Sequence, residues 1–116
     1  MYLSRLILAN FKNYTEASLN FSEKINCFSG NNGSGKTNLL DAIYYLSLTK
    51  SFFNLQDQQN IRFDADFFRI DGSLQMDADR RETVSCLQKR NSRKIFKLND
   101  KEYDRMADHI GLFPLV

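Results

Sequence analysis

The amino-acid sequence predicts an α/β sandwich with one long helix and a sheet that is partly mixed and partly antiparallel. Three features carry this prediction. First, a glycine-rich run follows a short apolar strand and begins an amphipathic helix. Second, two strand-like runs precede this unit. Third, strands joined by tight turns follow the helix. With 116 residues, of which 42% are hydrophobic, the chain is long enough for one small domain or a piece of a larger one.

The first part of the chain predicts three strands. Residues 3–9 are apolar enough for a mostly buried strand, and the Asn-rich residues 10–14 then turn the chain. Apolar and polar residues alternate from 16 to 21, which predicts a half-buried strand. After a turn at residues 22–24, the apolar run at residues 25–29 reads as a buried strand that leads into the glycine-rich run.

Residues 30–37 read Gly-Asn-Asn-Gly-Ser-Gly-Lys-Thr, which is a complete phosphate-binding P-loop motif. The glycines permit the backbone angles that point successive N–H groups at one anion. Lys36 places a positive charge against the outer phosphates, and the Thr37 hydroxyl suits one coordination position on Mg²⁺. The alternative is a surface turn of small residues. The flanking strand and helix favour the phosphate site, because they aim a helix N-terminus at the anion.

Residues 38–48 are predicted to continue as a helix after the P-loop. The residues of its apolar stripe are Leu39, Leu40, Ile43 and Leu46. The residues expected to face away from that stripe are Asn38, Asp41 and Tyr45. The polar, Gln- and Asn-rich residues 49–60 that follow predict an exposed, ligand-facing loop.

The second half of the chain predicts an antiparallel group of strands. Residues 67–76 form one strand, in which Gly72 suggests a bulge or a close approach of another element. Residues 82–89 and 93–98 read as strands joined by a turn at residues 90–92, and Asn99-Asp100 is a second tight turn. Asp104 is expected to cap a short helix at residues 105–110 that Gly111 ends.

Composition excludes several classes of function. The formal net charge of +2 is too small to predict a polyanionic partner by itself, and no apolar run approaches membrane-spanning length. Cys27 and Cys86 are expected to be buried free thiols, which suits a reducing cytoplasm. His109 is the only histidine and lies away from any Cys pair, so the pattern predicts no metal site of that kind. The apolar end of the chain suggests an N-terminal fragment.

Other classes of P-loop protein fit less well. A guanine-specific protein should show an Asn-Lys-x-Asp motif, and the sequence has none. Small GTPases also do not place two strand-like runs before the P-loop. Nucleoside kinases usually follow the P-loop helix with a parallel βα unit, whereas this chain continues into hairpins.

The chain resembles RecF-type and SMC-like ABC ATPases in three places. The first is Leu-Ile-Leu-Ala-Asn-Phe-Lys-Asn-Tyr at residues 6–14, and the second is the P-loop with Asn-Leu-Leu-Asp-Ala-Ile after it. The third, residues 108–116, is similar to the RecF family rather than to its SMC relatives. The resemblance runs over nearly the whole chain. It implies the first lobe of an ABC-type ATPase head, here residues 1–116.

The resemblance also implies what such a protein does. ATP binding, with Mg²⁺, brings two heads together as a homodimer on double-stranded DNA without sequence preference. The complete protein hydrolyses ATP, works with RecO and RecR at gaps, and helps to load RecA in replication and recombinational repair. This sequence contains neither a signature motif nor a Walker B strand. The fragment is therefore expected to bind ATP without hydrolysing it and to hold no catalytic residue.

The resemblance assigns the nucleotide site to particular residues. The expected phosphate-binding residues are Gly30, Asn31, Asn32, Gly33, Ser34, Gly35, Lys36, Thr37 and Asn38, with Thr37 also on Mg²⁺. Lys12 and Asn13 match a stretch near the nucleotide, so either is a candidate for a phosphate contact. The alternative is a capping or turn role for Asn10 and Asn13, with Lys12 solvated.

One segment departs from the family pattern. Many RecF sequences carry a Ser-His-Arg-like stretch after the P-loop helix, and residues 50–53 here read Lys-Ser-Phe-Phe. Lys50 and Ser51 are candidates to substitute in part for those contacts. Phe52 and Phe53 suit either an exposed partner or stacking site or the core, and core burial is the more common outcome for such residues.

Cations crowd the predicted hairpin. They are Arg80, Arg81, Lys89, Arg90, Arg93, Lys94 and Lys97. Across two strands and a turn they could form a basic ridge for the phosphates of DNA, and the solvated outer face of a hairpin would look much the same.

Two further functions remain as alternatives. One is another SMC-like ATPase or an overcoming-lysogenization-type ATPase. The other is a non-catalytic nucleotide-sensing or interaction module, in which ATP only stabilises the fold. A transporter ATPase fits less well, because the segment after the P-loop lacks that family's Gln-loop context.

Overall fold

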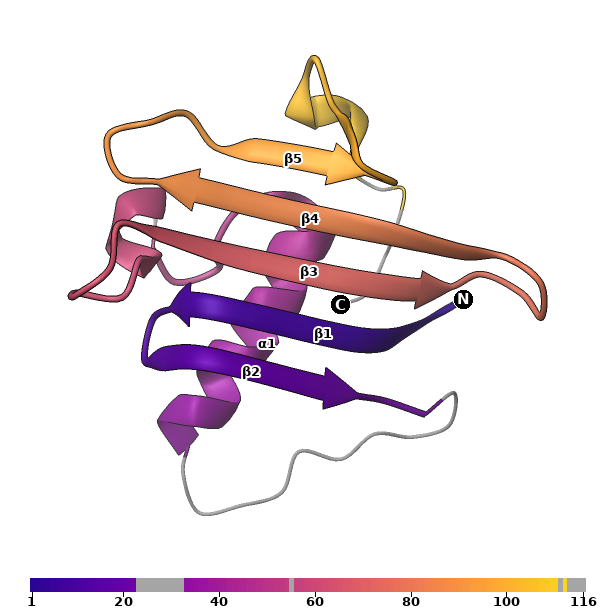
Figure 1. Ribbon diagram of the computed structural model, residues 1–116, viewed down its shortest axis with the longest axis horizontal. Coiled ribbons are helices and arrows are strands. Elements are labelled where there is room, and N and C mark those ends of the chain that lie inside the picture. Colours follow the sequence, from indigo (N-terminus) through magenta and orange to yellow (C-terminus); the bar gives the residue numbers. More distant parts are fainter. Residues whose placement is uncertain (23–32, 55, 111, 113–116) are drawn as a thin grey trace.

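The computed structural model describes residues 1–22, 33–54, 56–110 and 112. Six strands form one sheet in the order β2-β1-β3-β4-β5-β6, and every pairing among them is antiparallel. Helix α1 (Gly33–Leu48) crosses one face of this sheet (Figure 1). The strand predicted at residues 25–29 lies outside the described residues, and the described strands form no parallel pair that would make the sheet mixed.

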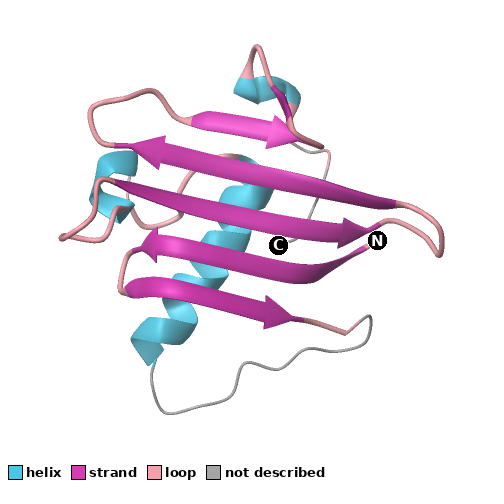
Figure 2. Ribbon diagram, in the orientation of Figure 1, coloured by secondary structure: helices cyan, strands magenta, loops and turns pink. Residues whose placement is uncertain are grey.

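The strands follow the predicted pattern closely. They are β1 (Tyr2–Phe11), β2 (Tyr14–Asn20), β3 (Phe67–Gln75), β4 (Arg81–Lys89), β5 (Ile95–Leu98) and β6 (Lys101–Glu102), shown in magenta in Figure 2. β1 lies between β2 and β3, and the chain reaches β3 only after passing through α1 and the 3₁₀ helix η1 (Asp57–Asn60). The segment that carries the P-loop therefore connects two strands that flank β1.

Two predicted turn features can be compared with the structure. Asn99 and Asp100 both adopt positive φ angles, 52° and 66°, between paired residues of β5 and β6, as a two-residue hairpin turn requires. The irregularity in the sheet lies in β1, between Leu3 and Arg5, rather than at Gly72. Gly72 instead permits a close approach, since a Cβ there would meet Leu46 Cδ1 at 2.5 Å. The helix can therefore pack directly on β3.

The core lies between α1 and the sheet. Its buried side chains include Leu6, Leu8 and Phe11 of β1, Phe68 and Ile70 of β3, Val84 and Cys86 of β4, and Leu39, Ala42 and Leu46 of α1. The predicted buried free thiol is confirmed for Cys86, while Cys27 lies outside the described residues. Burying apolar area of this kind is the main stabilising contribution to such a fold.

The face of α1 that packs on the sheet differs from the predicted stripe. Leu40, expected in the stripe, is 45% exposed, whereas Asp41 and Tyr45, expected to face away, are buried. The Tyr45 ring packs edge-on against Phe11 and Phe68, with centroid distances of 5.8 and 5.4 Å. The buried face of α1 is wider than the stripe of its aliphatic residues, so it also includes Asp41 and Tyr45. The spacing of aliphatic residues alone does not show how wide the buried face is.

Two predictions about the connections were also wrong in part. Residues 49–60 were expected to be an exposed loop, but Thr49, Ser51 and Asn60 are buried against α1. The helix expected at residues 105–110 is a single 3₁₀ turn, η2 (Met106–Asp108), and it has no side-chain cap from Asp104. In residues 49–60, polar side chains bonded to α1 replace the predicted solvent contacts: Ser51 bonds to Asp41, and Asn60 bonds to Tyr45.

Candidate nucleotide-binding site

The described part of the P-loop forms the start of α1. The helix begins at Gly33, so Gly33 to Thr37 make up its first turn, and residues 30–32 of the predicted site lie outside the described residues. Lys36 is partly buried and Thr37 is exposed. No acidic residue lies in this first turn. The positive end of the helix dipole is thus not offset by a carboxylate, which suits an anion.

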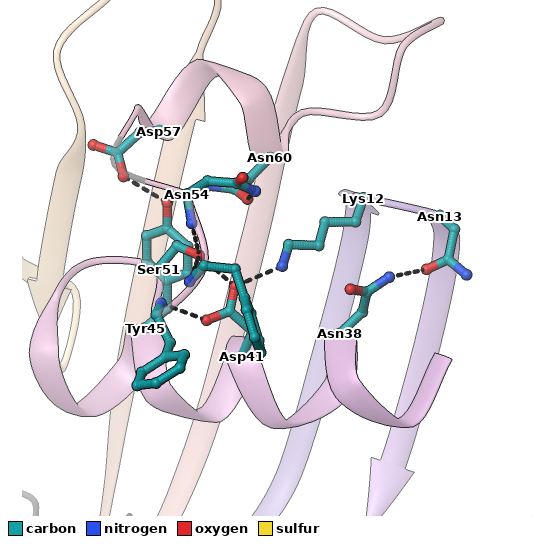
Figure 3. Close-up of polar contacts among 11 residues, drawn as sticks. Lys12, Asn13, Asn38, Asp41, Tyr45, Ser51, Asn54, Asp57 and Asn60 are labelled. Atoms are coloured by element: carbon teal, nitrogen blue, oxygen red, sulfur yellow. Dashed lines mark hydrogen bonds and ion pairs between the residues drawn. The ribbon is translucent and has the colours of Figure 1, made fainter. Parts of the chain in front are cut away.

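The β1–β2 turn lies against the same end of the helix. Asn38 Nδ2 donates a hydrogen bond to Asn13 Oδ1 at 2.8 Å (Figure 3). Arg62 also donates to the main-chain oxygen of Asn13, at 3.1 Å. The structure therefore brings the predicted residues 12 and 13 to the P-loop end of α1, from a position far away in the sequence.

Lys12 is paired inside the fold rather than solvated. Its ammonium lies 2.7 Å from Asp41 Oδ2 in an ion pair, and the two side chains are 12% and 0% exposed. The expected solvated Lys12 is therefore wrong, because the fold encloses most of the side chain. A phosphate contact by Lys12 stays a prediction.

Asp41 is the residue of this region that sequence reasoning missed. Besides Lys12, its carboxylate accepts hydrogen bonds from Ser51 Oγ at 2.5 Å and from the Phe52 N–H at 2.7 Å. Ser51 Oγ in turn accepts from the N–H groups of Phe53 and Asn54, both at 3.1 Å. The available signal was its spacing, one helical turn after Thr37, which places both residues on one side of α1.

Phe52 and Phe53 are exposed, 67% and 55%, so the expectation of core burial is wrong. Phe52 packs edge-on against Tyr44, and the Phe53 ring centroid lies 5.2 Å from Lys12 Nζ. Residues 50–53 are the stretch that departs from the family pattern. Within it, Ser51 is buried and bonds to Asp41, and the rings of Phe52 and Phe53 form a surface beside Lys12.

A second polar cluster lies farther along α1, around Tyr45. The Tyr45 hydroxyl donates to Asp57 Oδ1 at 2.5 Å and accepts from Asn60 Nδ2 at 2.8 Å. Lys94 Nζ lies 2.8 Å from Asp57 Oδ2. Burial, and next the hydrogen bond to Asp57, raise the pKa of Tyr45. This cluster joins η1 and the β4–β5 connection to the helix.

The predicted DNA-contacting cations do not lie together. Arg81 and Lys89 are exposed at opposite ends of β4, and the Lys94 side chain is only 12% exposed. Arg90 donates to main-chain oxygens of Ala65 and Arg62, at 2.7 and 3.2 Å. Of the other three, Arg80 and Arg93 lie within 4 Å of Glu82 and Glu102, and Lys97 is exposed on β5. The structure thus favours no single basic ridge on this hairpin, and DNA contact by these residues stays a prediction.

Comparisons with known proteins decide the family. Residues 1–110 match the family model described as AAA ATPase domain. The chain belongs to this family. No helix among the described residues is long and apolar enough to cross a membrane.

The predicted resemblance to RecF is confirmed across the whole chain. The chain is 53% identical over 116 residues to the DNA replication and repair protein RecF of Phocaeicola vulgatus, and 50% identical to that of Flavobacterium johnsoniae. Both alignments include the whole of this chain, but only 31% and 32% of the lengths of those two relatives. The chain therefore spans about a third of the length of the curated relatives it matches.

Solved structures agree with this assignment. A structure described as the recombination mediator protein RecF–ATP in the RecFOR pathway matches with a TM-score of 0.88 and 29% identity over 97% of this chain and 31% of that one. The SMC head domain from Thermotoga maritima matches with a TM-score of 0.73 and 27% identity over 93% of this chain and 40% of that one. The fold is thus that of the first lobe of an ABC-type ATPase head.

Proposed function

We propose that this chain is the ATP-binding part of a RecF-like ABC ATPase that acts in DNA replication and recombinational repair. The observation that carries the proposal is the match to RecF–ATP over 97% of the chain, which includes the helix that follows the P-loop. The identity of about half to curated RecF proteins supports the same conclusion.

The phosphates of ATP would lie at the N-terminus of α1, within the predicted set Gly30 to Asn38. Lys36 would donate to the outer phosphates, and the Thr37 hydroxyl would coordinate Mg²⁺, which supplies charge neutralisation there. The described geometry fits this use, because the first turn of α1 carries no acid and Thr37 faces solvent. Asn13 contacts Asn38, the residue after this turn, and Lys12 pairs with Asp41 farther along α1.

We expect hydrolysis to need groups outside this chain. The sequence contains no strand ending in paired carboxylates and no signature motif, so no described residue is assigned as a catalytic base. ATP-dependent association of two heads on double-stranded DNA, and action with RecO and RecR at gaps to load recombinase, belong to the same proposal for the whole protein.

The test is calorimetric titration of the chain with Mg-ATP, with Lys36→Ala as the matched variant. The proposal expects wild-type binding that the variant loses, because the lysine charge on the outer phosphates is removed. The fold of the variant should be unchanged, since Lys36 lies in the first helical turn. Equal binding by both proteins would reject the assigned phosphate site.

A further inference from the structure

One buried carboxylate joins three parts of the chain beside the predicted phosphate site. The Asp41 side chain is 0% exposed and accepts hydrogen bonds from Lys12, Ser51 and the Phe52 N–H. Lys12 belongs to the β1–β2 turn, and Ser51 and Phe52 to the segment that follows α1. A buried charge is stable only when it is paired and hydrogen-bonded, as it is here.

This cluster lies in the middle of α1, one helical turn beyond the predicted phosphate-binding residues. Asp41 follows Thr37 by one helical turn, so the two residues share one side of α1. The neighbouring bond between Asn38 and Asn13 holds the β1–β2 turn against the same turn of the helix. Figure 3 shows the Lys12 side chain reaching from the turn toward Asp41.

The Lys12 side chain is ordered by its surroundings. Its backbone has a φ of 52°, and its N–H donates to the main-chain oxygen of Asn60 at 2.8 Å. Its ammonium lies 5.4 and 5.2 Å from the ring centroids of Phe11 and Phe53. An ammonium has three N–H donors, and the Asp41 carboxylate uses one of them in this structure. Lys12 can therefore keep its bond to Asp41 and donate to a second anion.

We propose that Asp41 is a positioning residue of the nucleotide site, which holds Lys12 ready to donate to a phosphate oxygen. Asp41 acts through Lys12 and does not itself contact the nucleotide. Holding the long lysine side chain in place before binding removes the entropy cost of ordering it at the moment of binding. This inference rests on the proposed function, since it requires a phosphate group at the start of α1.

The test uses the full-length protein and three variants: Asp41→Asn, Lys12→Met and the two combined. The measured quantity is the Kd for Mg-ATP by calorimetry. Each single variant is expected to weaken binding roughly tenfold, the effect of losing one charge-assisted hydrogen bond. The double variant is expected to have the same Kd for Mg-ATP as Lys12→Met, because Asp41 affects phosphate binding only through Lys12.

The matched control is Asp57→Asn. Asp57 also pairs with a lysine that is 12% exposed, Lys94, at 2.8 Å, but it does so at η1 rather than at the β1–β2 turn. Both aspartate variants are expected to lower Tm, and only Asp41→Asn is expected to change the Kd for Mg-ATP. A general loss of stability would instead affect both titrations.

Three outcomes would overturn the inference: unchanged affinity in Asp41→Asn, equal loss in Asp57→Asn, or additive loss in the double variant. If Asp41→Asn does not fold, the titration of Lys12→Met tests the inference instead. A Kd for Mg-ATP equal to that of the wild type in Lys12→Met would also overturn the inference. Lys36→Ala separates the two proposals. If Lys36→Ala binds Mg-ATP as well as wild type, the proposed function fails; if it loses binding while Asp41→Asn keeps it, only the role of Asp41 fails.

Discussion

The buried imidazole of His109 bonds to the main-chain oxygen of Leu46, near the end of α1. Nε2–H donates to that oxygen at 2.5 Å, and Nδ1 accepts from the Tyr103 hydroxyl at 3.0 Å. The ring also packs against Phe96, with the centroids 5.1 Å apart. A neutral imidazole can make both hydrogen bonds, because one ring nitrogen donates and the other accepts. His109 therefore links residues 103–109 to α1.

This contact predicts that the chain loses stability in mild acid. Burial lowers the pKa of His109 below its ordinary value, so the folded state resists protonation. The unfolded chain takes up the proton below about pH 6.5. The contribution of His109 is therefore complete above that pH and is lost as the pH falls through the folded-state pKa. Urea unfolding at about pH 7.5 and pH 5.5 measures this loss.

His109→Gln is the control for the pH effect, because an amide can donate to Leu46 but does not titrate. The variant should be less stable than wild type near pH 7.5 and should show a smaller loss between the two pH values. An identical pH dependence in both proteins would show that other groups, such as the carboxylates, cause it.

Tyr45→Phe is predicted to destabilise the chain by about 1–3 kcal/mol. The change removes the hydroxyl that donates to Asp57 and accepts from Asn60, and it leaves the buried Asn60 amide without that partner. The ring contacts with Phe11 and Phe68 remain. Urea unfolding checks the value, and Tyr44→Phe serves as control because the Tyr44 side chain is only partly buried. A smaller loss in Tyr45→Phe than in Tyr44→Phe would contradict the prediction.

Gly72→Ala is predicted to destabilise the fold by about 1–3 kcal/mol through overpacking. The added Cβ would lie 2.5 Å from Leu46 Cδ1 and 3.2 Å from Leu3 Cδ1, so the helix or those side chains must move. A double-mutant cycle with Leu46→Ala tests the cause. The combined loss should be smaller than the sum of the single losses, because the smaller residue makes room for the new methyl group. Simple additivity would show that the two positions do not collide.

The Cys86 thiol is predicted to be unreactive in the folded chain. The residue is fully buried, and burial raises the pKa of its thiol, so little thiolate forms and reagents do not reach it. In a Cys27→Ser background, a chromogenic disulfide reagent should react with Cys86 only at the rate of unfolding. Urea should raise that rate to the value of an exposed thiol. Rapid modification without urea would mean that β4 opens readily in the native state.

DNA binding by the full-length protein, if it uses the β4–β5 hairpin, should depend on Arg81, Lys89 and Lys97. These side chains are exposed, whereas Lys94 is mostly enclosed in its pair with Asp57. Alanine at one exposed position should lower the affinity for double-stranded DNA and reduce the slope of log K against log salt by about one. Unchanged slopes in all three variants would exclude this hairpin as a phosphate-contacting surface.

The strands and the hairpin turn could be predicted from local patterns. The alternation of apolar and polar residues predicted β2. The pair Asn99-Asp100 predicted a tight turn, and both residues have positive φ angles in the structure. The arc of the helix that is buried could not be predicted in this way. Leu40 and Asp41 exchange their expected environments, because residues 51 and 52 fold back along α1 and supply hydrogen bonds to the carboxylate.

The sequence alone determined the P-loop motif, the helix after it and the family, because these depend on residues that are close together in the chain. The tertiary structure decided how the site is supported. Lys12 and Asp41 form an ion pair, and Tyr45, Asp57 and Lys94 form a second cluster, across turns that are distant in sequence. Buried polar groups need partners, and only the folded chain shows which groups lie within hydrogen-bonding distance.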